Sequence, residues 1–128
     1  MVLQLLHRLT ESTEKQMELK TEKRQGGILI VRMQVDRLDD CNVRDFQQTM
    51  MSLIDERYQV VLDVAPVRFV DSCGFGALLA CLLMIKSRCG DLALCCLSGT
   101  LGPLFALMRM HQVFDVYPTC EEAVVAFS

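Results

Sequence analysis

The segment Asp71-Ser72-Cys73-Gly74 combines a carboxylate, a hydroxyl and a thiol directly before an apolar helical pattern. A serine hydroxyl can accept a phosphoryl group, and a cysteine thiol can act as a nucleophile beside a base. A helix that begins here has unpaired amides and about half a positive charge at its N-terminus. We therefore expect the amides around Cys73, Gly74 and Phe75 to be able to receive an anion such as a phosphate group.

Covalent catalysis by this segment is not favoured. Cys73 would need a general base, and the two histidines, His7 and His111, lie outside the segment. Ser72 lacks the G-x-S-x-G pattern of a hydrolase elbow, and the glycines do not have the spacing of a Walker loop or a dinucleotide-binding fingerprint. The sequence thus predicts a non-enzymatic protein that needs no cofactor.

Aspartates and cysteines form the other groups with possible chemistry. Asp36, Asp39 and Asp40 suit a solvated turn with helix capping better than a pair of catalytic acids. The seven cysteines are an odd number and contain no C-x-x-C pair. We expect them to be small apolar residues in a reducing compartment, and we expect no metal site.

Composition excludes several classes of function. The 128 residues suit one domain, and 52% hydrophobic with 23% charged residues is a globular balance. A net charge of -3 gives no general attraction to nucleic acid. The apolar stretch 74–85 is shorter than the ~20 residues that span a bilayer. The start, 1–9, lacks the pattern of a secretory signal, so we expect a cytoplasmic protein without a membrane span.

The periodicity predicts an α/β fold that positions the segment between a strand and a helix. Residues 1–14 form an amphipathic helix or extension, and 15–128 form the domain. A hairpin of strands 17–24 and 28–35, with a turn at Gly26-Gly27, is followed by alternating helices and buried strands. The expected helices are 41–57, 72–88, a short one carrying 104–108, and one after the Thr119 cap; the expected later strands are 60–64, 92–97 and 113–116.

Three stretches resemble the STAS domain family, which includes anti-sigma factor antagonists and the cytosolic tails of sulfate transporters. VVLDVAPVRFVDSCGFGALLACL is similar to the family's signature, in which a buried strand leads to Asp-Ser-Ser/Thr-Gly-Leu-Gly at a helix start. RLDDCNVRDF resembles the entry to the family's first helix, and HQVFDVYPTCEEAVVAF resembles its closing segment. The match extends over about 17–127. This chain departs from the signature at Cys73 and Phe75.

The resemblance implies a small mixed β-sheet with helices in a regular β-α superhelix. It also implies partner switching, in which an anti-sigma factor antagonist binds an anti-sigma factor of the serine/threonine kinase type. Phosphorylation of the first signature serine, Ser72 here, blocks binding, and a phosphatase restores it. The partner-binding surface predicted on this basis consists of Asp71, Ser72, Cys73, Gly74, Phe75, Gly76, Ala77 and Ala80.

Two alternatives stay open. In the first, Asp71 or Ser72 serves purely as a helix cap and the glycines serve internal packing. In the second, the STAS module scaffolds a transporter, a lipid-transport complex or a stress-sensing assembly. The helix after Ser72 is also apolar on a second face, formed by Ala77, Ala80, Cys81 and Met84 beside Leu83. We expect this face to be covered by the N-terminal helix, a second copy of the chain or a partner.

Overall fold

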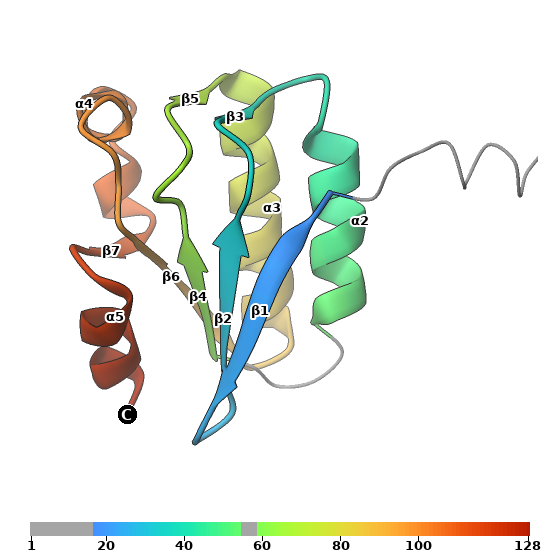
Figure 1. The fold of residues 1–128 in the computed structure, drawn as a ribbon, viewed down its shortest axis with the longest axis vertical. Helices are drawn as coiled ribbons and strands as arrows, with labels where there is room; N and C mark the ends of the chain where they lie inside the picture. Colours follow the sequence, from blue (N-terminus) through green and yellow to red (C-terminus); the bar gives the residue numbers. More distant parts are fainter. Residues whose placement is uncertain (1–16, 55–58) are drawn as a thin grey trace, which may run out of the picture.

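The computed structural model describes residues 17–54 and 59–128, and it contains a five-stranded mixed sheet (Figure 1). The strand order is β1-β2-β4-β6-β7. β1 pairs with β2 antiparallel, and all other neighbours are parallel. The predicted α/β fold with an N-terminal hairpin and parallel strands is confirmed. The strands are β1 (Leu19–Arg24), β2 (Ile28–Met33), β4 (Gln59–Asp63), β6 (Asp91–Cys95) and β7 (Asp115–Tyr117).

The hairpin forms where the sequence predicts it. Gly26 and Gly27 have φ angles of 83° and 74°, which residues with a Cβ rarely adopt, and they join Arg24 to its partner Ile28. β1 is the half-exposed edge strand, whereas β2 is buried along nearly its whole length. This difference follows from the continuous apolar run of β2, which is covered on both faces.

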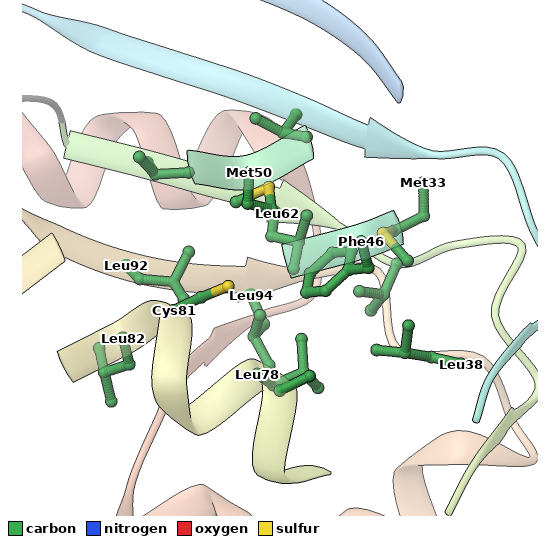
Figure 2. Packing of buried hydrophobic residues seen from close by; sticks show 14 of the residues in the cluster. Met33, Leu38, Phe46, Met50, Leu62, Leu78, Cys81, Leu82, Leu92 and Leu94 are labelled. Carbon is green, nitrogen blue, oxygen red and sulfur yellow. The ribbon is translucent and has the colours of Figure 1, made fainter. Parts of the chain in front are cut away.

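Helices cover both faces of the sheet and create two apolar clusters. The larger cluster joins one sheet face to α2 (Val43–Leu53), α3 (Ser72–Ser87) and α4 (Leu101–Leu107). In it, Phe46 and Met50 of α2 and Leu78 of α3 lie over Leu62 and Leu94 of the strands (Figure 2). The smaller cluster joins the opposite face to α5 (Cys120–Phe127). The sheet is therefore the central layer of the domain, with helices on both faces.

A small second sheet, which the periodicity did not predict, lies at the end of the domain where α3 begins. β3 (Arg37–Leu38) pairs in parallel with β5 (Phe69–Val70). These strands have two residues each, too few for an alternating pattern to be visible in the sequence. They hold the two loops that precede α2 and α3 next to each other.

Several predicted bounds differ from the structure. The strand expected over 92–97 ends at Cys95, because Cys96 has a left-handed φ of 65°. A short 3-10 helix, η1 (Met110–Gln112), precedes β7, which begins later than predicted. The second helix, predicted over 41–57, spans only Val43–Leu53, with Ile54 at its C-cap. The predicted helix within 1–14 lies outside the described residues. Among the residues described, no helix has the length and apolar character needed to cross a bilayer.

Side chains cap the starts of α3 and α5 but not that of α2. Thr119 Oγ1 accepts a hydrogen bond from the Glu122 amide at 3.1 Å, as predicted for the closing helix. Asp71 caps α3 through its side chain. Asn42 occupies the N-cap position of α2, but its side chain bonds backwards to the Asp39 amide at 2.9 Å and stabilises the preceding turn instead of the helix.

Candidate functional site

Asp71 fixes the start of α3 with three hydrogen bonds. Its backbone is extended, and its Oδ1 accepts from the Gly74 amide at 2.8 Å. Its Oδ2 accepts from the Asp40 amide at 3.2 Å, and its own amide donates to the Leu38 carbonyl at 3.2 Å. Asp71 therefore binds the helix start to the loop that follows β3, and Ser72 becomes the first residue of the helix.

Ser72 and Cys73 are both exposed at this helix start. The amides that could receive an anion are fewer than the sequence suggested. The Gly74 amide is bonded to the Asp71 carboxylate, and the Phe75 amide donates to the Asp71 carbonyl at 2.9 Å. The prediction that these two amides would receive a phosphate is therefore wrong. Ser72 and Cys73 supply the remaining amides of the first turn, which have no partner within the helix.

Gly74 is required by packing inside the domain. A Cβ at this position would lie 2.3 Å from the Leu38 carbonyl oxygen and 2.6 Å from Val70 Cγ1, both far inside normal contact. Gly76, two residues further along the helix, is exposed, and a Cβ there would have no atom within 4 Å. Of the two glycines predicted to lie on the partner-binding surface, Gly74 is buried and only Gly76 is exposed.

The eight residues predicted to bind a partner divide into two groups. Ser72, Cys73, Gly76 and Ala80 are exposed, and Asp71 is half-buried. Three are buried in the domain, which excludes them from a contact surface: Gly74, Phe75 and Ala77. The Phe75 ring packs on Phe105 of α4 at 5.4 Å between centroids, so it stabilises the core.

The second apolar face predicted for α3 is mostly covered within the described residues. Cys81 is 3% exposed and belongs to the core with Ala77, so their prediction as surface residues is wrong. They are buried because α3 packs on α2 as well as on the sheet. Leu83 remains 60% exposed.

A groove that sequence reasoning missed runs between α2 and α3. It is lined by Gln47, Met51, Ala80, Cys81 and Met84. Met51 projects from α2 and is 55% exposed. The groove requires α2 to lie beside α3, and that pairing of helices is not visible in the periodicity of either one. On α3 its lining begins at Ala80, further along the helix from Ser72.

We expect replacement of Asp71 by alanine to lower the free energy of unfolding by about 1–2 kcal/mol, because an N-cap acceptor is lost. Asparagine ranks with aspartate as a cap and keeps an oxygen for the Gly74 amide, so Asp71→Asn should lose less than half as much. Urea unfolding measures both values. Equal losses in the two variants would show that the cap does not stabilise the helix start.

The hairpin-led mixed sheet, the two helical layers and the exposed serine at the start of α3 together define an α/β domain of the STAS class. A family model for the STAS domain matches residues 20–123. The chain therefore belongs to the STAS domain family.

Known proteins similar to this chain carry two kinds of description. An anti-sigma F factor antagonist of Paenibacillus polymyxa is 28% identical over 105 residues, which cover 80% of this chain and 86% of that protein. The structure of an anti-sigma-factor antagonist (STAS) domain protein from Planctomyces limnophilus superposes with a TM-score of 0.76 at 19% identity, covering 89% of this chain and all of that one. A murine anion transporter, Solute Carrier 26 family member A9, matches with a TM-score of 0.74 at 16% identity, over 95% of this chain and 24% of the transporter.

Proposed function

We propose that this protein is an anti-sigma factor antagonist that binds an anti-sigma factor kinase and is released from it when Ser72 is phosphorylated. The observation that carries the proposal is that Ser72, the first residue of α3, is exposed on the helix whose Ala80 and Met84 line the groove shared with α2. The description of the Paenibacillus relative agrees with this function.

The contact surface that we propose, called here the switch surface, follows the exposed side of α3. It consists of Ser72, Cys73, Gly76, Ala80 and Leu83. Ser72, Gly76 and Ala80 are spaced four residues apart and share one helical face. Because their side chains are small, the backbone of a partner can approach the helix closely, while Leu83 offers apolar area.

Phosphorylation would change the charge of this surface without disturbing the domain. The Ser72 Oγ–P bond forms as the γ-phosphoryl group leaves ADP, and the hydroxyl proton passes to a base of the kinase. The product carries nearly two negative charges next to the carboxylate of Asp71. A partner would have to bury both charges, whereas water solvates them in the free protein. A phosphatase reverses the change by hydrolysis of the phosphoester.

The proposal places binding, not catalysis, at this site. Cys73 is exposed at the helix start, but His111 lies on η1 at the edge of the Phe105 ring and is not among the residues of the switch surface. Partners of the kinase and phosphatase type would act in the cytoplasm. A homodimer could use the same exposed side of α3, and it would then compete with the kinase.

The direct test is incubation of the full chain with the anti-sigma factor kinases of its own organism and ATP, followed by mass spectrometry and a binding assay. We expect a stable complex before phosphorylation, a single phosphate on Ser72, and loss of the complex afterwards. Failure of every such kinase to bind would overturn the proposal. That result would leave the alternative of a scaffolding role. The likeness to the transporter does not support that role by itself, since it shows the fold alone.

A second prediction tests the switch surface without touching Ser72. Ala80→Arg places a long cation in the groove and should weaken kinase binding at least about tenfold, which corresponds to ~1.4 kcal/mol. Ala106, an exposed alanine of α4, provides the matched control Ala106→Arg, which should bind as the wild type does. Isothermal titration calorimetry gives both affinities. Equal affinities for the two variants would place the interface elsewhere.

A further inference from the structure

A cluster of metal-binding side chains lies at the carboxyl ends of two neighbouring strands, on residues that the proposed switch does not use. Asp63 ends β4, Cys95 ends β6, Cys96 follows it, and Cys120 is the first residue of α5. One carboxylate oxygen and the three Sγ atoms all lie within 4.8 Å of one another. Three separate segments of the chain therefore bring four potential ligands to one point.

The backbone directs both consecutive cysteines to this point. In a regular strand, neighbouring side chains point to opposite faces of the sheet. Cys96 instead has a left-handed φ of 65°, and its amide donates to the Tyr117 carbonyl at 3.1 Å. The strand thus ends with a change of direction that brings the Cys96 thiol to the Cys95 thiol, while register places Asp63 directly beside Cys95.

We propose that Asp63, Cys95, Cys96 and Cys120 form a binding site for a thiophilic divalent cation of the Zn²⁺ type. Zn²⁺ takes four ligands in a tetrahedron, and sulfur or carboxylate ligands at about 2.0–2.3 Å from the metal lie about 3.3–3.8 Å apart. The observed separations need only small side-chain rotations to reach this arrangement. Soft thiolates select Zn²⁺ over Mg²⁺ or Ca²⁺, which prefer oxygen.

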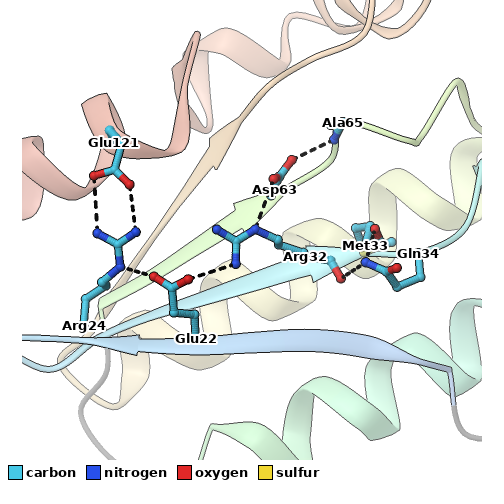
Figure 3. A network of polar contacts seen from close by, with 8 residues as sticks. All are labelled: Glu22, Arg24, Arg32, Met33, Gln34, Asp63, Ala65 and Glu121. Atoms are coloured by element: carbon cyan, nitrogen blue, oxygen red, sulfur yellow. Dashed lines mark hydrogen bonds and ion pairs between the residues drawn. The ribbon is translucent and has the colours of Figure 1, made fainter.

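The residues around the carboxylate would support a metal ligand. Asp63 Oδ1 accepts from the Ala65 amide at 2.9 Å, and Oδ2 lies 3.7 Å from Arg32 Nε (Figure 3). Such outer contacts orient a ligating carboxylate. Three thiolates and a carboxylate would carry more negative charge than one divalent ion neutralises. Arg32 supplies a positive charge next to the site that offsets part of this excess.

The same environment argues against a reactive thiol in this cluster. Burial, the largest cause, raises the pKa of Cys120 to about 11, and it raises the pKa of Cys95 further. Both are therefore protonated at neutral pH and poor nucleophiles without a metal. The absence of a C-x-x-C pair led the sequence reading to expect no metal site. A C-x-x-C pair supplies two ligands from a single turn, whereas the four ligands of this site come from three separate segments of the chain.

The test uses the full reduced chain and Co²⁺, which reports its geometry by absorption. We expect one equivalent of Co²⁺ to give the intense visible bands of a tetrahedral site with a sulfur-to-cobalt charge-transfer band, and Zn²⁺ to displace it. Cys96→Ser and Cys120→Ser should each weaken binding at least about 100-fold, a loss larger than most outer-contact changes cause. Cys41 and Cys89 are exposed and lie outside the cluster, so Cys41→Ser and Cys89→Ser should bind as the wild type does.

A second measurement keeps the test valid if a cluster variant does not fold. In the wild type, Zn²⁺ should protect Cys96 from alkylation and leave Cys41 and Cys89 reactive. A weak octahedral Co²⁺ spectrum, binding that persists in both cluster variants, or alkylation that Zn²⁺ does not slow would each overturn the site. The Cys41→Ser control also distinguishes metal binding at the proposed site from binding at the exposed group Asp39, Asp40 and Cys41. None of these readouts depends on the kinase.

Discussion

Ser72→Asp is expected to weaken binding to the anti-sigma factor kinase at least about 100-fold, since a charge buried without a partner costs several kcal/mol and each ~1.4 kcal/mol is tenfold. The new carboxylate would stand on the switch surface beside Asp71. Ser72→Ala removes one exposed hydroxyl and adds no charge, so it should bind with nearly wild-type affinity and resist release by ATP. Calorimetry or surface plasmon resonance with the unphosphorylated proteins gives these affinities.

The control is a carboxylate on the same helix but away from the switch surface. Ser87, the last residue of α3, is exposed, and Ser87→Asp adds the same charge at the opposite end. It should bind the kinase within about twofold of the wild type, a difference well below 1 kcal/mol. If Ser87→Asp and Ser72→Asp weakened binding equally, net charge and not position would control the complex, and the phosphoswitch would be refuted.

Binding and stability should separate in these variants. A negative charge at the N-terminus of a helix is favourable by about 0.3–1 kcal/mol, so Ser72→Asp should unfold at the same or a slightly higher urea concentration. Replacing the Ser72 side chain removes no cap, because the Asp71 carboxylate already accepts the hydrogen bond from the Gly74 amide. If the variant is at least as stable as the wild type but binds the kinase more weakly, the loss of affinity must arise at the interface and not from unfolding.

Local patterns were sufficient to predict the fold and the place of Ser72 at a helix start. Gly26-Gly27 marked the hairpin, continuous apolar runs marked the buried strands, and the resemblance aligned Ser72 with a helix start. The faces of α3 could not be predicted in the same way. Its sequence is apolar at almost every position, so periodicity does not show that Ala77 and Cys81 face α2 and the sheet while Leu83 faces solvent.

Features that depend on contacts between distant segments also could not be predicted from the sequence. The groove needs Met51 of α2 beside Met84 of α3, and the β3–β5 sheet has too few residues for a periodic signal. The cysteine cluster needs the left-handed φ of Cys96, a conformation uncommon for residues with a Cβ. Each arises from packing of the whole domain and not from local preference.

Gly74→Ala is expected to be the most destabilising single change at the helix start, with a loss of about 3 kcal/mol in the free energy of unfolding. The added methyl group would stand 2.3 Å from the Leu38 carbonyl oxygen, which is backbone and cannot rotate away. Relief requires α3 to move from β3 and β5, which disturbs the hydrogen bonds of Asp71 to Leu38 and Asp40. Urea denaturation followed by circular dichroism measures the loss.

Gly76→Ala is the matched control, because it adds the same methyl group two residues further along the same helix. Its Cβ has no atom within 4 Å, and alanine in a helix is more favourable than glycine by about 0.5–1 kcal/mol. The two variants should therefore shift stability in opposite directions. A loss of similar size in both would mean that backbone freedom, and not the close approach of Leu38, explains the first glycine. The same pair also tests partner binding: Gly76→Ala, although stable, should weaken the kinase complex, because its methyl group projects from the switch surface.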